Sequence, residues 1–166
     1  MTTIKNELIG TWKLLSYIEL PISGTDSLFP LGKNPYGLLI YAPDGFMSAQ
    51  IANTGRMPYK SNDKLKPDLE EMASTLKGYM AFTGKYKVDE NMAIVHYLVK
   101  SSLFPNWNNQ VLSRKIYFEG DVLFMKTTAP ILSNDELVNA YMTWQKVDQS
   151  IDDFFDEKVL AEYREL

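Results

Sequence analysis

Two ionisable side chains lie within strand-like segments and could act on a small organic molecule. His96 is the only histidine in the chain, and an imidazole exchanges protons near neutral pH. Arg114 falls on the mostly apolar face of residues 110–119, together with Leu112, Ile116 and Phe118. A buried guanidinium requires hydrogen-bond acceptors, and it can bind a carboxylate or enolate oxygen through two parallel N–H groups. These two residues are therefore the candidates for catalysis, if the protein is an enzyme, and for binding a ligand.

Both residues also have a structural interpretation. His96 could bond to a neighbouring strand, and neither face of residues 92–102 is clearly polar, so its inward position is a hypothesis. Arg114 could instead bond backbone carbonyl groups or stack on Trp12. Nucleophile motifs, phosphate loops and paired metal-ligand spacings are absent from the sequence, and there is no cysteine. We therefore expect no hydrolase chemistry, no metal site and no cofactor.

Further candidate pocket residues come from mixed polar and aromatic faces. Ser48 and Gln50 share one face of the predicted strand 46–52 with Phe46, and a few polar groups within an apolar lining are typical of small-molecule pockets. In the alternative, these residues face solvent and the opposite face fills the core. For residues 136–147 that alternative is favoured, because one face is more apolar. This face consists of Val138, Ala140, Met142 and Trp144.

Turn residues divide most of the chain into strand-like runs. The runs cover residues 10–20, 36–42, 46–52, 82–89, 92–102, 110–119, 122–128 and 136–147. Pro43, Asp44 and Gly45 predict a tight turn between the second and third runs. About eight strands, mostly neighbours in sequence, predict an all-β fold: a single antiparallel up-and-down β-barrel that closes on itself. The aromatic segment 104–107 (Phe-Pro-Asn-Trp) lies between two strands, either as an entrance or dimer contact or, as we favour, as a plug of one end.

Two helices are expected besides the strands. Residues 67–77 have a proline and acidic residues in the first turn and Gly78 after the last, and we expect this helix to cap an open end of the barrel. Its apolar face consists of Leu65, Leu69, Met72 and Leu76. Residues 149–166 show helical spacing at Ile151, Phe155 and Val159. We therefore divide the chain into a barrel domain, residues 1–147, and a helical extension, residues 148–166, that packs on the barrel or on a second subunit in a homodimer.

Composition restricts the function classes. The 166 residues are 45% hydrophobic, and 17 basic against 21 acidic side chains give a net charge of −4. Nucleic-acid binding requires clustered Lys and Arg, so it is not expected. The N-terminal segment lacks the pattern of a signal peptide, and the sequence contains no apolar run long enough for a membrane helix. We expect a cytoplasmic protein that does not bind membranes.

Several segments, taken in order, carry a family resemblance. They include Leu8–Leu14 (Leu-Ile-Gly-Thr-Trp-Lys-Leu), residues 30–32 and 37–41, residues 43–50 (Pro-Asp-Gly-Phe-Met-Ser-Ala-Gln), residues 78–86, His96, residues 102–107, Gln110 and Arg114. Between about residues 8 and 147 the chain resembles the bacterial and fungal lipocalin-like domain family. The resemblance implies a calycin-type barrel with an internal cavity, in which Trp12 closes the base and Arg114 is a candidate cation over its ring. It does not imply one chemistry.

These observations lead to one main hypothesis and one alternative. The protein binds a small hydrophobic or amphipathic molecule in the barrel cavity. Alternatively, it is a cofactor-free cyclase or isomerase of a polyketide-, terpenoid- or lipid-derived substrate, with His96 moving the proton and Arg114 or Tyr86 stabilising negative charge on oxygen. A third possibility, a filled barrel that is structural or binds a partner through the aromatic segment and the C-terminal helix, would exclude both. The expected ligand-binding residues are Trp12, Tyr41, Ser48, Gln50, Tyr86, His96, Trp107 and Arg114.

Overall fold

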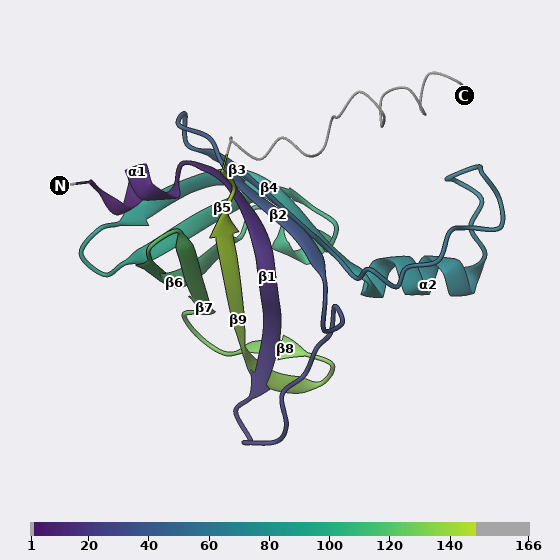
Figure 1. The fold of residues 1–166 in the computed structure, drawn as a ribbon. Coiled ribbons are helices and arrows are strands. Elements are labelled where there is room, and N and C mark those ends of the chain that lie inside the picture. The colour runs from purple at the N-terminus through teal and green to yellow at the C-terminus, as the bar shows by residue number, and fades with distance from the viewer. Residues whose placement is uncertain (1, 149–166) are drawn as a thin grey trace.

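The strands of the computed structural model, which describes residues 2–148, form a closed barrel (Figure 1). They are β1 (Gly10–Pro21), β2 (Tyr36–Tyr41), β3 (Phe46–Ala52), β4 (Tyr79–Asp89), β5 (Ile94–Ser102), β6 (Val111–Glu119), β7 (Val122–Thr127), β8 (Ile131–Ser133) and β9 (Glu136–Lys146). Consecutive strands pair antiparallel from β1 to β7, β7 pairs with β9, and β9 pairs with β1. This confirms the predicted all-β barrel of eight main strands. The short β8 adds a hairpin to β9.

Two glycines have a clear physical role in this architecture. Gly45 adopts a φ of 91° in the turn between β2 and β3, which is the left-handed region that favours glycine. Gly84 lies so close to β5 that an added Cβ atom would be 2.0 Å from the backbone oxygen of Leu98. The pairing of β4 with β5 shifts its register at this point, between Thr83 and Gly84. Any side chain at position 84 would therefore push β4 and β5 apart.

A β-bulge in β1 determines which of its side chains enter the barrel. The register of β1 against β9 shifts between Leu14 and Ser16. Before the shift, Trp12 and Leu14 are buried, and after it Tyr17 and Glu19 are buried instead. Strict alternation from Trp12 would have placed even-numbered residues inside along the whole strand. The extra residue thus brings a phenol and a carboxyl group into the barrel.

A short helix closes one end of the barrel, which we call the base. Helix α1 (Ile4–Leu8) has its first backbone N–H groups bonded to the Glu90 carboxylate, at 2.8 and 3.1 Å. Leu8, the last residue of this helix, is fully buried, and Trp12 at the start of β1 is almost fully buried. The indole nitrogen of Trp12 donates to the Leu8 carbonyl oxygen at 2.8 Å, and its ring lies 6.0 Å from that of Phe118. The base is therefore a packed end with its buried indole N–H satisfied.

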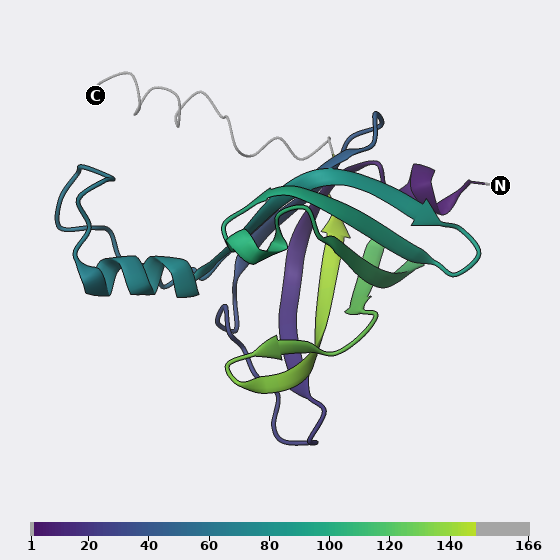
Figure 2. The same cartoon turned by 180° about the vertical axis from the view of Figure 1, so that it is seen from behind.

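Helix α2 (Leu69–Lys77) forms close to where the sequence predicts it but does not cap the barrel. Asp68 and Glu71 form a reciprocal capping box at its first turn, which explains its start locally. Both views in Figures 1 and 2 show the helix projecting from the barrel wall, beside the start of β4. None of its residues is buried, and Leu69 is 81% exposed. The expected end cap is thus corrected: only the last turn of α2, through Leu76 and Lys77, reaches the interior cavity described below.

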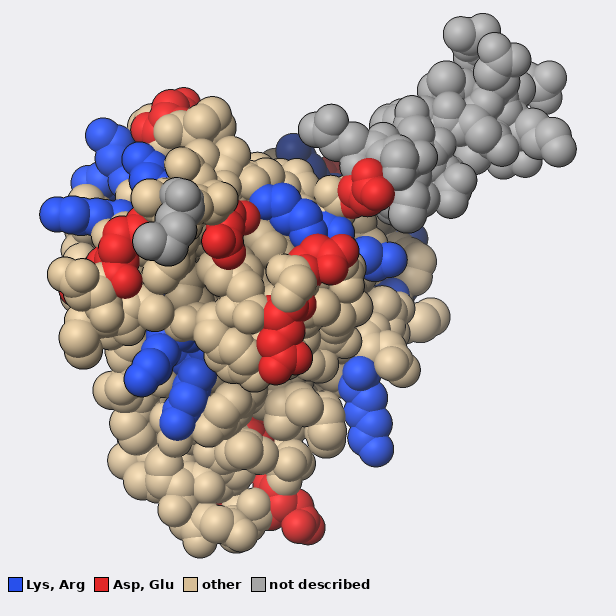
Figure 3. Space-filling model, turned by 60° about the vertical axis from the view of Figure 1, so that its left-hand side comes forward, with Lys and Arg blue, Asp and Glu red and all other residues tan. Residues whose placement is uncertain are grey.

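The predicted C-terminal helix, residues 149–166, lies outside the described residues. Among residues 2–148, no helix has the length and apolar character needed to cross a membrane. Charged side chains are concentrated over the upper part of the face shown in Figure 3. The lower part, at the height of β8 and the end of β1, carries few of them. This less charged part of the surface borders the open end of the barrel.

Candidate functional site

The barrel interior contains a cavity of about 440 Å³ at the end opposite the base. Cavities of a few hundred Å³ are typical of small-molecule sites. Strands β1 to β7 and β9 contribute to its wall, and β8, α2 and the segment after β5 contribute near its opening, which we call the mouth. Most of the wall is apolar: it includes Leu39, Ile51, Met80, Phe82, Met125 and Met142.

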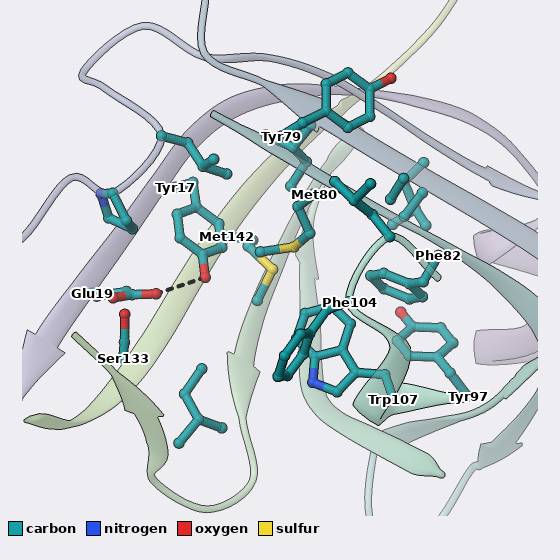
Figure 4. A pocket seen from close by; sticks show the side chains of 18 of the residues that line it. Tyr17, Glu19, Tyr79, Met80, Phe82, Tyr97, Phe104, Trp107, Ser133 and Met142 are labelled. Atoms are coloured by element: carbon teal, nitrogen blue, oxygen red, sulfur yellow. Dashed lines mark hydrogen bonds between the residues drawn. The ribbon is translucent and has the colours of Figure 1, made fainter. Parts of the chain in front are cut away.

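A row of aromatic rings runs from the mouth into the core (Figure 4). Trp107, in the 3-10 helix η1 (Pro105–Trp107), packs edge-on against Phe104 and Phe82, with ring centroids 5.6 and 5.7 Å apart. Phe82 in turn contacts Tyr97 at 5.8 Å. Phe104 is 51% exposed and Trp107 is half-buried, so this segment lines the rim and does not fill the end. Such rings offer flat apolar contacts to an aromatic ligand.

Arg114 lies inside the barrel, as the alternation of β6 predicts, and it lines the cavity. Its guanidinium donates a hydrogen bond to the Ser113 carbonyl oxygen, at 2.9 Å, and within residues 2–148 no ion pair involves it. Burial lowers the pKa of Arg114, and the nearby tyrosines Tyr97, Tyr17 and Tyr41 oppose this shift. A guanidinium stays charged at neutral pH even so. The cavity therefore contains a cation whose N–H groups make one hydrogen bond, to Ser113, among the described residues.

Tyr17 and Glu19 supply a second polar group in the wall. The Tyr17 hydroxyl donates to Oε1 of Glu19 at 2.9 Å, and both side chains are almost fully buried (Figure 4). Burial, followed by the charge and hydrogen bond of Glu19, raises the pKa of Tyr17 far above its ordinary value. Burial also raises the pKa of Tyr97 to about 12. These phenols therefore remain neutral hydrogen-bonding groups across the physiological pH range.

The structure brings together only two of the residues predicted to bind a ligand. Arg114 and Trp107 both line the cavity. Trp12, Tyr41 and Tyr86 are buried but do not line it. Trp12 belongs to the base. The Tyr41 hydroxyl bonds to that of Tyr97, and the Tyr86 hydroxyl donates to the Ala42 carbonyl oxygen at 2.8 Å. These three are packed core residues with internal hydrogen bonds.

The expected inward position of His96 is wrong. Its strand neighbours Val95 and Tyr97 point into the core, so His96 points outward. There its Nδ1 atom lies 2.7 Å from the Ser113 hydroxyl oxygen on the outer face of β6. Both faces of β5 carry large apolar side chains, which is why alternation alone did not decide this strand. His96 consequently has the structural role that was its alternative interpretation.

Ser48 and Gln50 also lie outside the barrel, which corrects the prediction that they line the pocket. Met47, Ala49 and Ile51 fill the interior from β3. Gln50 accepts a hydrogen bond from the Tyr79 hydroxyl, and with Ser48 it lines a shallow groove of about 160 Å³ on the outer surface. The face favoured for residues 136–147 is confirmed, since Val138, Ala140, Met142 and Trp144 are buried.

The cation over Trp12 is also not Arg114. The Lys146 ammonium nitrogen lies 4.5 Å from the centre of the Trp12 ring. It donates hydrogen bonds to the carbonyl oxygens of Glu7, at 3.0 Å, and Ile9. Lys146 thus donates to carbonyl groups near the end of α1, whereas Arg114 lines the cavity.

Sequence reasoning missed Tyr17 and Glu19 altogether. The signal was an acidic residue in a predominantly apolar stretch at the end of the first strand. Its direction depends on the bulge between Leu14 and Ser16, and period-two alternation does not show a bulge.

The family model of the lipocalin-like domain matches residues 9–147. The chain belongs to the lipocalin-like domain family. A protein of Aspergillus oryzae (strain ATCC 42149 / RIB 40), named 4'-hydroxy-3'-methoxypropiophenone carrier protein, is 26% identical over 108 residues, which cover 61% of this chain and 96% of that protein. The lipocalin-like family and this relative support a ligand-binding barrel.

Proposed function

We propose that this lipocalin-like protein binds and carries a small aromatic carbonyl compound in the barrel cavity. Support comes from the size of the cavity, about 440 Å³, and from its apolar and aromatic wall. The relative named for an aryl ketone suggests the same chemical class. Apolar contact supplies most of the affinity, as in small-molecule sites generally.

The observation on which the proposal depends most is the buried guanidinium of Arg114, which forms no ion pair within residues 2–148. A ligand carbonyl oxygen that accepts from Arg114 would compensate the cost of burying this charge. The ketone group then fixes the orientation of the ligand, and its ring packs between Trp107, Phe82 and the methionine side chains. The outward position of His96 removes the proton-transfer residue of the isomerase alternative, so the proposal does not extend to catalysis.

Isothermal titration calorimetry tests this proposal with 4'-hydroxy-3'-methoxypropiophenone and its analogue in which a CH₂ group replaces the carbonyl. We expect the ketone to bind about tenfold more tightly, the value of one hydrogen bond to a charged group. Arg114→Met should abolish this difference. Lys115→Met is the matched control, because Lys115 is the exposed neighbour of Arg114 on the same strand.

Two results would count against the proposal. Failure of both compounds to bind would reject this ligand class. Binding that persists unchanged in Ala49→Phe, which adds a ring to the cavity wall at an inward position of β3, would place the ligand elsewhere. Native mass spectrometry of protein purified from its own host gives an independent measurement, since a retained aromatic carbonyl compound would be detected as a discrete added mass.

A further inference from the structure

Glu19 contains a buried acceptor atom that no group within residues 2–148 uses. Its side chain is 3% exposed and lines the cavity. Oε1 accepts from the Tyr17 hydroxyl, whereas Oε2 is buried and has no hydrogen-bond partner among the described residues. Figure 4 shows the carboxyl group beside the cavity, at the side where Ser133 lies. Buried carboxyl oxygens are normally hydrogen-bonded, so an unused one in a cavity wall requires an explanation.

The position of Glu19 is fixed by the backbone on both sides. Its N–H donates to the Leu28 carbonyl at 3.0 Å, and its own carbonyl accepts from the Leu28 N–H at 2.8 Å. On the other side, Glu19 is paired with Ala140 of β9. The bulge in β1 has already turned its side chain inward. The carboxyl group is therefore held in the wall by paired strands and is not the end of a mobile loop.

The cavity also restricts the charge of the molecule that meets Glu19. Arg114 and Glu19 bring opposite formal charges to the same wall, and no ion pair between them is formed. A ligand ammonium group would add a second cation to the site of Arg114, and a ligand carboxylate would add a second anion to that of Glu19. Both would raise the cost of desolvation. A neutral ligand with one donor and one acceptor matches both groups.

We infer that Oε2 of Glu19 accepts a hydrogen bond from a ligand hydroxyl group, so that the protein selects hydroxyl-bearing aryl carbonyl compounds over their ethers. This inference rests on the proposed function, because it assigns the second polar contact of the same cavity. Arg114 binds the carbonyl oxygen and Glu19 binds the hydroxyl hydrogen. The two contacts together determine which end of the ligand points toward β1 and which toward β6.

The test compares para-hydroxypropiophenone with para-methoxypropiophenone by calorimetry. In the wild-type protein we expect the phenol to bind about tenfold more tightly than the ether, because only the phenol donates to Oε2. In Glu19→Gln the amide oxygen still accepts from Tyr17, and the amide NH₂ group takes the place of Oε2. The preference should then disappear or reverse toward the ether. Glu119→Gln is the matched control, since Glu119 is an exposed residue at the end of β6, and it should keep the wild-type preference.

Tyr17→Phe provides a second variant in case Glu19→Gln folds poorly. It leaves both carboxyl oxygens of Glu19 available, so the preference for the phenol should be equal to that of the wild type or greater. Loss of the preference in Tyr17→Phe would assign the ligand hydroxyl to Tyr17 and would overturn the inference.

The two levels of the proposal fail in different ways. If both compounds bind wild type with the same ratio of affinities as Glu19→Gln, the role of Glu19 is wrong and the carrier function stands. If neither compound binds any variant, the proposed function itself is rejected. If the phenol is preferred in wild type, Tyr17→Phe and Glu119→Gln and not in Glu19→Gln, the hydroxyl contact is established.

Discussion

The two ends of this barrel differ in whether their buried polar groups have hydrogen-bond partners. At the base, the Trp12 indole donates to Leu8, and Lys146 bonds to two carbonyl groups. In the cavity, the Trp144 indole nitrogen and Oε2 of Glu19 are buried without partners, and Arg114 has no ion pair within residues 2–148. Because unsatisfied buried groups reduce stability, the comparison indicates that the base stabilises the fold and that the cavity is arranged for another molecule. Replacing residues at each end tests this division.

The largest effect is expected from Trp12→Ala. Trp12 is 2% exposed and packs against Phe118, so its removal should lower the free energy of unfolding by about 3–5 kcal/mol. Urea unfolding followed by circular dichroism measures this. Trp107→Ala at the mouth is the comparison, and we expect a loss of about 1 kcal/mol because Trp107 is only half-buried. Equal losses at the two positions would contradict the division.

Alkaline pH should destabilise the cavity side through its buried phenols. The pKa of Tyr97 is about 12 in the folded protein and about 10 in an unfolded chain. The unfolded state therefore loses this proton first, so stability is intact below about pH 10 and falls by about 3 kcal/mol by about pH 12. Tyr41, whose pKa burial also raises, adds to the loss. Urea unfolding across this range should show a smaller pH dependence in Tyr97→Phe; an unchanged slope would exclude Tyr97 as a source.

The two cations should respond with opposite sign to replacement by methionine. Lys146→Met leaves carbonyl groups of Glu7 and Ile9 without their donor and should lower stability by about 1 kcal/mol. Arg114→Met removes a buried charge that forms no ion pair with the rest of residues 2–148, and it should raise stability by about 1 kcal/mol, with loss of ligand binding. Thermal unfolding of both variants measures the pair. A destabilised Arg114→Met protein would mean that Arg114 supports the fold.

The smallest effect is expected at α2. Leu69 is 81% exposed, so Leu69→Gln should change the free energy of unfolding by less than about 0.5 kcal/mol. Ile51→Gln, which introduces a polar group into the core from β3, is the matched contrast and should destabilise strongly. A marked loss in Leu69→Gln, measured by chemical denaturation, would show that α2 packs against something in solution.

Sequence patterns predicted most of the fold because local signals agree with it. Strands β4, β6 and β9 each have one clearly apolar face, and their side chains point as alternation requires. The start of α2 is also specified by nearby residues, because Asp68 and Glu71 form its capping box. The direction in which α2 projects depends on packing with the rest of the barrel, and no local pattern contains that information.

The candidate site was harder to predict. Arg114 was recognised because it is a charge on an apolar face. His96 was misplaced because β5 has no polar face to compare. Ser48 and Gln50 were assigned to the cavity on their hydrogen-bonding chemistry, although the opposite face of β3 is the more apolar one. Glu19 was missed because one extra residue in β1 reverses the pattern of the strand.

That extra residue also shows how this family can change its ligands. Position 15 is exposed and contributes no side chain to the interior. Deleting it would give β1 regular alternation with the phenol and carboxyl groups still inward, whereas pairing the full-length strand without the bulge would turn Ser16 and Ile18 into the wall in their place. Trp12, Leu14 and the whole base would keep their places. The gain or loss of a β-bulge in one strand is therefore a route by which evolution can exchange the chemistry of the binding site while leaving intact the end of the barrel that holds the fold together.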